Sequence, residues 1–305
     1  MMPETKDVQA LKRRLGPVGV WNSTLSGEPA SVEREAAAEI ESLGFGTLWI
    51  GETPTGKEAL AHAAILLGAT SSLTVATGIA SIWGRDATAA ANGANTLAEA
   101  YESRFVLGLG VSHAPAVAGR GHDYSKPVTA MREYLDAMDA TEYAGPLPEP
   151  APRLLAALRG RMLELAARRA YGAHPYFVTP EHTARARAAL GPEPVLAPEQ
   201  TVILESDPDR ARQIARGFTA RYLALPNYTN NLLDLGWRQD DLTDGGSDAL
   251  VDAIVAWGDP DRIIERVRAH HEAGADHVCI QPLADSPQQL LEHLRVLARS
   301  DVVAS

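Results

Sequence analysis

The segment Thr47-Leu-Trp-Ile-Gly-Glu52 decides the fold, because it is an apolar run of strand length between two helical patterns. Residues 31–43 precede it with apolar side chains at helical spacing, a predicted N-cap at Ser31 and a C-terminal stop at Gly44. Residues 57–67 follow it with a second helical pattern. Strands separated by helices need crossover connections, so this alternation predicts a parallel sheet.

The same alternation extends in both directions along the chain of 305 residues. Strands are predicted at residues 18–23, 47–52, 73–82, 105–111, 153–157, 174–178, 200–205 and 277–281. Helices are predicted between them, with a loop at 112–126 and a broken helical region at 208–257. Eight β/α units favour an α/β fold in which residues 1–305 form a single (β/α)8 TIM barrel, with insertions after strands 4 and 7. A doubly wound open sheet is the alternative, but the first βα turn, Trp21-Asn-Ser-Thr24, lacks its Gly-rich fingerprint.

Composition narrows the class of protein. The formal net charge of −11 gives no basic footprint for nucleic acid. The apolar runs fall short of the roughly 20 residues that a membrane helix needs, and the N-terminal segment lacks the apolar core of a secretory signal. Cys279 is the only cysteine, which rules out an intrachain disulfide and is typical of a reducing compartment. We therefore expect a cytoplasmic enzyme with a small-molecule substrate and no nucleic-acid or membrane partner.

Two side chains at predicted strand ends are the candidates for proton transfer. In a TIM barrel the active site lies at the carboxyl ends of the strands. Glu52 ends an apolar strand there, where its surroundings can retune the pKa. His113 follows the strand Leu107-Gly-Leu-Gly110, and a histidine can relay a proton. The alternatives are a carboxylate that holds a neighbouring loop and a histidine packed on the rim.

A third candidate is the turn Ala157-Leu-Arg-Gly-Arg161, which opens a predicted helix. Unpaired N–H groups at a helix N-terminus bind anions, and Arg159 and Arg161 add positive charge. The alternative is an ordinary helix start with solvated arginines. The segment His174-Pro-Tyr176 ends the sixth predicted strand, where its rings could wall a flat cofactor or support the rim.

Metal catalysis is not indicated. The nine histidines show no ligand spacing, and neither HExxH nor CxxC is present. Residues 51–57 approach a phosphate-binding loop, but Glu58 stands where that motif needs Ser or Thr.

Four segments carry a resemblance to a known family. They are Leu43-Gly-Phe-Gly-Thr-Leu-Trp-Ile-Gly-Glu52, Thr77-Gly-Ile79, Arg104-Phe-Val-Leu-Gly-Leu-Gly-Val-Ser-His-Ala-Pro115 and Tyr171-Gly-Ala-His-Pro-Tyr-Phe-Val-Thr-Pro180. In order and spacing they resemble the luciferase-like monooxygenase superfamily, and most closely its F420-dependent oxidoreductase branch. The resemblance implies a TIM barrel that binds coenzyme F420 or, as the alternative, FMN, and that forms a homodimer.

The resemblance also implies residue roles. A non-prolyl cis peptide is expected at Gly78-Ile79 behind the deazaflavin ring, and the turn at 158–161 is expected to hold the phosphate side arm. Cofactor contacts are expected from Thr77, Gly78, Ile79, Gly110, Val111, Ser112, Leu158, Arg159, Gly160, Arg161 and His174. Substrate contacts are expected from Trp21, Thr53, Trp83 and Tyr176, and proton transfer from His113 or Glu52.

The chain departs from the family pattern at three places. Thr53 follows Glu52 where relatives often have histidine, and His113 stands where some sugar-phosphate-oxidising relatives carry glutamate. The turn at 158–161 reads Leu-Arg-Gly-Arg where relatives commonly have Gly-Pro. The leading hypothesis is hydride transfer between F420 and a small organic substrate. An FMN-dependent monooxygenase and a non-catalytic cofactor-binding barrel are the alternatives, and residues 112–126 and 223–246 are expected to shape the substrate pocket.

Overall fold

The computed structural model describes residues 7–22, 24–146 and 149–303, so residue 23, the end of the first predicted strand, lies outside it. All strand pairs of the described sheet are parallel. The strands are β1 (Val18–Asn22), β2 (Thr47–Ile50), β3 (Thr74–Thr77), β4 (Ala80–Ser81), β5 (Phe105–Gly110), β6 (Arg153–Leu155), β7 (Gly172–Ala173), β8 (Val195–Leu196), β9 (Glu199–Ile203), β10 (Ala256–Trp257) and β11 (Val278–Pro282).

The strand order runs β10-β9-β11-β1-β2-β3-β5-β6-β7-β8, with β4 beside β5. Only Ala197 and Pro198 separate β8 from β9. Since β8 pairs with β7 and β9 pairs with β11, the two ends of the sheet meet in one bent segment. The predicted α/β class with parallel strands is confirmed, and the arrangement is TIM-barrel-like.

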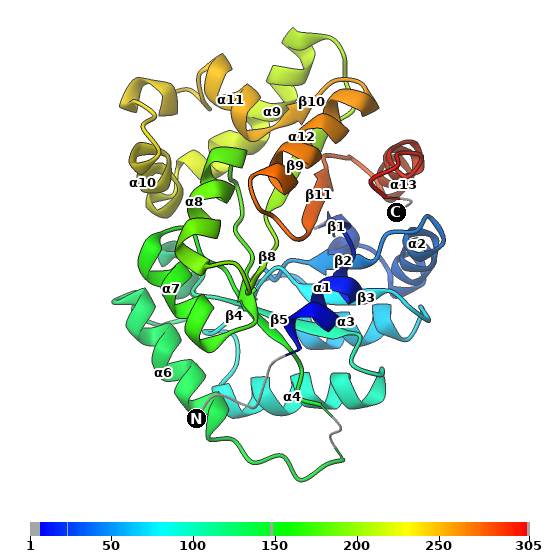
Figure 1. Ribbon diagram of the computed structural model, residues 1–305, viewed down its shortest axis with the longest axis vertical. Coiled ribbons are helices and arrows are strands. Elements are labelled where there is room, and N and C mark those ends of the chain that lie inside the picture. Colours follow the sequence, from blue (N-terminus) through cyan, green and yellow to red (C-terminus); the bar gives the residue numbers. More distant parts are fainter. Residues whose placement is uncertain (1–6, 23, 147–148, 304–305) are drawn as a thin grey trace.

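Helices surround the strands, and α9, α10 and α11 gather at one end of the molecule, at the top of the view in Figure 1. The helices are α1 (Val8–Leu15), α2 (Ala30–Ser42), α3 (Ala59–Leu67), α4 (Ala87–Ala100), α5 (Ala114–Gly119), α6 (Pro127–Asp139), α7 (Gly160–Arg169), α8 (Pro180–Leu190), α9 (Pro208–Leu223), α10 (Pro226–Asp234), α11 (Asp248–Ile254), α12 (Pro260–Glu272) and α13 (Pro287–Leu297). Short 3-10 turns cover Thr24–Gly27 and Gln239–Leu242. None of the helices within the described residues has the length and apolarity of a membrane span.

Helix α1 closes the end of the barrel at which the strands begin. Its Leu11 and Leu15 pack with inward-facing strand residues in one buried cluster. Its C-terminal carbonyls are also bonded from inside the barrel, since Thr47 Oγ1 donates to Leu15 O at 2.9 Å and His277 Nδ1 donates to Gly16 O at 2.8 Å. The opposite end, where the strands finish, is therefore the candidate position for a site.

Local structure differs from the sequence prediction at several places. The third predicted strand is two strands, β3 and β4, separated by a cis peptide bond between Gly78 and Ile79. The predicted loop 112–126 contains α5, and the end of the predicted helical region 208–257 contains β10. Residues 174–178 lie beyond β7 rather than in a strand, because Phe177 has a φ of +60°. The N-cap of α2 is Pro29, not Ser31.

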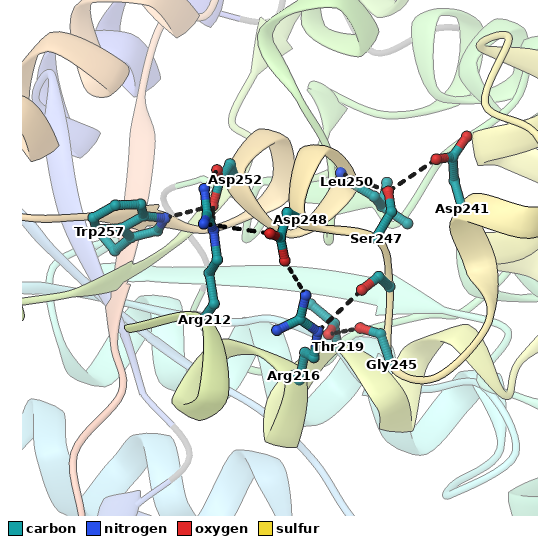
Figure 2. A network of polar contacts seen from close by, with 11 residues as sticks. Arg212, Arg216, Thr219, Asp241, Gly245, Ser247, Asp248, Leu250, Asp252 and Trp257 are labelled. Carbon is teal, nitrogen blue, oxygen red and sulfur yellow. Dashed lines mark hydrogen bonds and ion pairs between the residues drawn. The ribbon is translucent and has the colours of Figure 1, made fainter. Parts of the chain in front are cut away.

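The helices above the barrel are fixed by the polar network in Figure 2. Arg212 of α9 forms a bidentate ion pair with Asp252 of α11, with Nε–Oδ1 at 3.0 Å and Nη2–Oδ2 at 2.6 Å. Trp257 Nε1 donates to the same Asp252 Oδ1 at 2.7 Å. These bonds tie α9 to both α11 and β10. They therefore help to hold α9, which contributes two aromatic side chains to the site, Phe218 and Tyr222.

Candidate active site

A backbone bulge between β3 and β4 forms the centre of the open barrel end. Thr77 Oγ1 donates to Gly108 O at 2.7 Å, which holds the bulge against β5. A Cβ on Gly108 would lie 1.8 Å from Thr77 O, and one on Gly110 would lie 2.5 Å from Ile79 Cγ1. Glycine at these two positions of β5 therefore allows the bulge to approach the strand closely, which explains their place in the strand.

The bulge is backed from inside the barrel by Trp21 and His174. Trp21 Nε1 donates to Gly78 O at 3.1 Å. His174 is 1% exposed, stacks on Trp49 with ring centroids 4.3 Å apart, and donates from Nδ1 to Ala197 O at 2.7 Å. Burial lowers its pKa to about 4, so it is neutral. Gly78 and Ile79 are partly exposed, and the Gly78 backbone is held on both sides, because its N–H donates to Ile50 O at 2.7 Å and its carbonyl accepts from Trp21.

An aromatic wall stands beside this backbone. We use that name for six rings whose neighbouring centroids lie 4.8–6.4 Å apart: Trp21, Tyr176, Phe177, Phe218, Tyr222 and Tyr228. They come from β1, the segment after β7, α9 and α10. Elements far apart in sequence thus build one aromatic cluster, in which Tyr176 and Tyr222 are partly exposed and the other four rings are buried.

Tyr176 is the polar centre of the aromatic wall. Its hydroxyl donates to Gln281 Oε1 at 2.8 Å and therefore accepts the hydroxyl proton of Tyr222 at 2.9 Å. Burial raises the pKa of Tyr176 well above its usual value, so the phenol stays protonated. Tyr176 lies against Trp21, the other aromatic side chain of the aromatic wall that was predicted to contact substrate.

His113 lies at the N-terminus of α5 and contacts α10. Its Nδ1 is 3.2 Å from Asn227 Oδ1, and its ring centroid is 5.5 Å from that of Tyr228. Burial lowers the pKa of His113, against the opposing effect of the Asn227 hydrogen bond. With Nδ1–H donated to Asn227, Nε2 is the basic nitrogen of the neutral ring. Position and protonation state both suit a proton acceptor.

Glu52 is held by two partners in this structure. Its Oε2 accepts the backbone N–H of Ser81 at 2.7 Å, and its Oε1 forms an ion pair with Arg85. Arg85 is held in turn by Glu58 at 2.6 Å. These contacts anchor the segment after β4 to the end of β2. A role for Glu52 in proton transfer would require this ion pair to break first.

The turn at 158–161 carries two arginines, Arg159 and Arg161. Arg159 precedes α7 without forming a side-chain cap, and its one ion pair within the described residues is a 3.8 Å contact with Asp234. Arg161 and Gly160 are exposed, with open space where a Cβ on Gly160 would stand. His182 Nε2 donates to Leu158 O at 2.7 Å and fixes the turn from below. The helix start is therefore open to an anion.

Other predicted residues lie in the segments after β2, β4 and β5. Trp83 Nε1 donates to Val111 O at 3.0 Å, and its ring lies 5.4 Å from that of His122. Ser112 has a φ of +58° at the point where the chain leaves β5. Thr53 is exposed in the loop after β2 and is not brought to the aromatic wall by any described contact. Within the described residues no group of His, Cys, Asp and Glu could hold a metal ion.

Several residues of the mouth were not predicted as site residues. They are Glu199, Phe218, Tyr222, Asn227 and Tyr228. The last three lie next to or within the region expected to shape the pocket, but helical periodicity does not say which side chain enters the mouth. Glu199 precedes the predicted seventh strand, and alternation along β9 places it inside the barrel with Thr201.

Comparison with known proteins agrees with this architecture. The luciferase-like monooxygenase family model matches residues 15–277. An F420-dependent secondary alcohol dehydrogenase in complex with an F420–acetone adduct superposes with a TM-score of 0.74 at 15% identity, covering 95% of this chain and 99% of that chain. Coenzyme F420-dependent tetrahydromethanopterin reductase from Methanopyrus kandleri gives 0.70 at 15% identity, covering 93% and 97%.

A flavin enzyme is similar to about the same degree. The oxygenating constituent of 3,6-diketocamphane monooxygenase from the CAM plasmid of Pseudomonas putida, in complex with FMN, gives a TM-score of 0.67 at 17% identity, covering 95% of this chain and 98% of that chain. No curated protein sequence matches significantly. These likenesses establish the fold, and the family model establishes the kinship. The chain belongs to the luciferase-like monooxygenase family.

Proposed function

We propose that this protein is an F420-dependent oxidoreductase, a (β/α)8 barrel that transfers hydride between the deazaflavin and a small organic substrate. The observation that carries the proposal is that the partly exposed Gly78-Ile79 segment and the exposed helix start with Arg159 and Arg161 both follow parallel strands, β3 and β6, at the same end of the sheet. A planar ring with an anionic side arm fits these two features together. The similar F420-dependent enzymes support the same choice of cofactor.

The proposed cofactor site uses residues from five strand ends, those of β1, β3, β5, β6 and β7. The bulge at Thr77, Gly78 and Ile79 would support the ring, and Gly110 to Ser112 would flank it. Arg159 and Arg161 would bind the side arm with the first amides of α7. Trp21 and His174 would hold the bulge from behind, through the contacts described above.

The proposed chemistry divides between cofactor and protein. When bound, the deazaflavin supplies the carbon that gives or takes hydride. The aromatic wall would orient the substrate and exclude water, with Trp21 and Tyr176 nearest the bulge. His113, neutral at pH 7 because burial lowers its pKa, would exchange the proton at Nε2. Glu52 would act only after release from Arg85.

Cofactor binding is the first test of this function. Adding the protein to F420 is expected to quench or shift deazaflavin fluorescence in a saturable way, because the ring moves from water to an aromatic environment. FMN titrated in parallel is the competitor. Tight FMN binding with unchanged F420 fluorescence, together with oxygen consumption in the presence of reduced FMN, would indicate a monooxygenase instead. Binding of F420 without turnover of any substrate class would favour a cofactor-binding role.

The helix start at 159–161 gives a second test. The double variant Arg159→Gln/Arg161→Gln is expected to weaken F420 binding about tenfold, because two cations facing an anionic side arm are lost. The salt dependence of binding should also decrease. Arg168→Gln, an exposed arginine farther along α7, is the matched control and should bind like the wild type. Equal affinities for the double variant and this control would contradict the proposed side-arm site.

A further inference from the structure

Glu199 is a buried carboxyl that lies against the aromatic wall. It is 1% exposed and begins β9, next to β11 and the segment after β7. Its Oε1 accepts the Thr201 hydroxyl at 2.6 Å, and its Oε2 accepts the Phe177 N–H at 3.2 Å. Glu33 and Glu52 are paired with Lys57 and Arg85, whereas Glu199 has no ion-pair partner among the described residues.

The N–H that Glu199 accepts belongs to a strained residue. Phe177 has a φ of +60°, the left-handed region that bulky residues rarely occupy. Such a conformation persists only where the surroundings hold it. The hydrogen bond to Glu199 helps to keep Phe177 in this conformation, and it also satisfies a buried N–H that would otherwise have no acceptor.

The strained turn sets the position of two rings of the aromatic wall. Tyr176 precedes Phe177 and reaches Trp21 at 5.2 Å between centroids. Phe177 stacks on Tyr222 at 5.1 Å. Any change in the hydrogen bond to the Phe177 N–H therefore changes the positions of these two rings of the aromatic wall.

The groups that face Glu199 are uncharged near neutral pH. They are Tyr176 after β7, Thr201 in β9, Cys279 in β11, Tyr222 in α9 and Tyr228 in α10. Burial raises the pKa of each tyrosine and of the Cys279 thiol, so none of these loses its proton near pH 7. Burial also raises the pKa of Glu199 to about 7, against the two hydrogen bonds that lower it. Both forms of this carboxyl are thus populated around neutral pH.

We propose that Glu199 is a positioning residue of the barrel mouth, which holds the Tyr176-Phe177 turn through the Phe177 N–H and alters that hold when it gains or loses a proton. A carboxylate accepts this bond about twice as strongly as a neutral acid does. Deprotonation therefore tightens the turn and fixes Tyr176 against Trp21. Protonation loosens both.

The proposal can be tested without cofactor, so its outcome is separate from that of the proposed function. The amide resonance of Phe177 and the indole N–H resonance of Trp21 are followed by NMR from pH 6 to pH 9. In the wild type both are expected to titrate with one shared midpoint near pH 7. Glu199→Gln keeps an acceptor oxygen but has no titrating proton, so the transition should vanish. Glu205→Gln, a half-buried carboxyl just beyond β9, is the control and should leave it in place.

A second variant keeps the test decisive if Glu199→Gln does not fold. Thr201→Val removes one hydrogen bond to the carboxylate, so the midpoint should rise by about one pH unit. Phe177 and Trp21 resonances that stay constant from pH 6 to pH 9 in the wild type would overturn the proposal. A midpoint unmoved by Thr201→Val, or a transition that survives in Glu199→Gln, would overturn it as well.

Discussion

Acidification from pH 7 to pH 5 is expected to lower the free energy of unfolding by about 6 kcal/mol, because buried histidines must take up protons when the protein unfolds. Burial lowers the pKa of His174 and His182 to about 4, and that of His270 and His277 to about 3. All four are at most 2% exposed. The loss is a large part of the roughly 5–15 kcal/mol that stabilises a typical domain.

Stability falls on acidification because the pKa values of these histidines are lower in the folded protein than in the unfolded chain. An unfolded histidine has a pKa of about 6.5, so below that value the unfolded chain binds more protons than the folded one. The contribution of these histidines to stability is fully present above pH 6.5. It is lost as the pH falls toward their folded-state pKa values. Each histidine contributes about 2 kcal/mol of loss at pH 5, about 8 kcal/mol together. Glu199 acts in the opposite direction, since its raised pKa makes the neutral acid the favoured folded form, and it restores about 2 kcal/mol.

Burial keeps the four histidines neutral, and at two of them hydrogen bonds to both ring nitrogens also oppose a second proton. His277 donates from Nδ1 to Gly16 O and accepts from Trp49 Nε1 at Nε2, so a second proton would break one bond. His270 likewise uses both nitrogens, with Thr183 and Gln200. Urea unfolding followed by circular dichroism at pH 7, 6 and 5 measures the effect. A free energy of unfolding that is the same at pH 7 and pH 5 would contradict it.

Replacing Gly108 with alanine is expected to destabilise the protein by about 3 kcal/mol or more and to weaken cofactor binding. The new Cβ would lie 1.8 Å from Thr77 O, a backbone atom that cannot move without displacing the bulge. Thermal unfolding and F420 titration measure the two effects. Gly217→Ala in α9 is the matched control, since nothing lies within 4 Å of its Cβ position, and alanine should stabilise that helix by about 0.5–1 kcal/mol. A Gly108→Ala protein as stable as the wild type would show that β5 does not need to approach the bulge so closely.

The sequence was sufficient for features that depend on local pattern. Alternating strand and helix patterns predicted the parallel α/β sheet, and the family resemblance predicted the cis peptide at Gly78-Ile79. The stretch at 174–178 has strand composition, yet the Pro175 ring and the left-handed Phe177 take it out of the sheet. Tertiary contacts decided this conformation, and no local propensity encodes them.

Long-range pairing explains most of what was missed at the site. Glu52 was predicted from its position at a strand end, but whether it is free depends on Arg85, which lies 33 residues away in sequence. Glu199 was missed for the opposite reason. A carboxyl next to an apolar strand is expected at the surface, and only the closed arrangement of the strands buries it. Tyr222 and Asn227 reach the mouth only because α9 and α10 fold back over it, and helical periodicity does not specify that path.

Helix α1 closes one end of the barrel, so the site can be reached only from the other end. Whatever enters between the ends of the strands must leave by the same opening, since Leu11 and Leu15 occupy the far end. For the proposed reaction between a cofactor and a substrate, we therefore expect an ordered sequence, in which the molecule seated deeper binds first and leaves last.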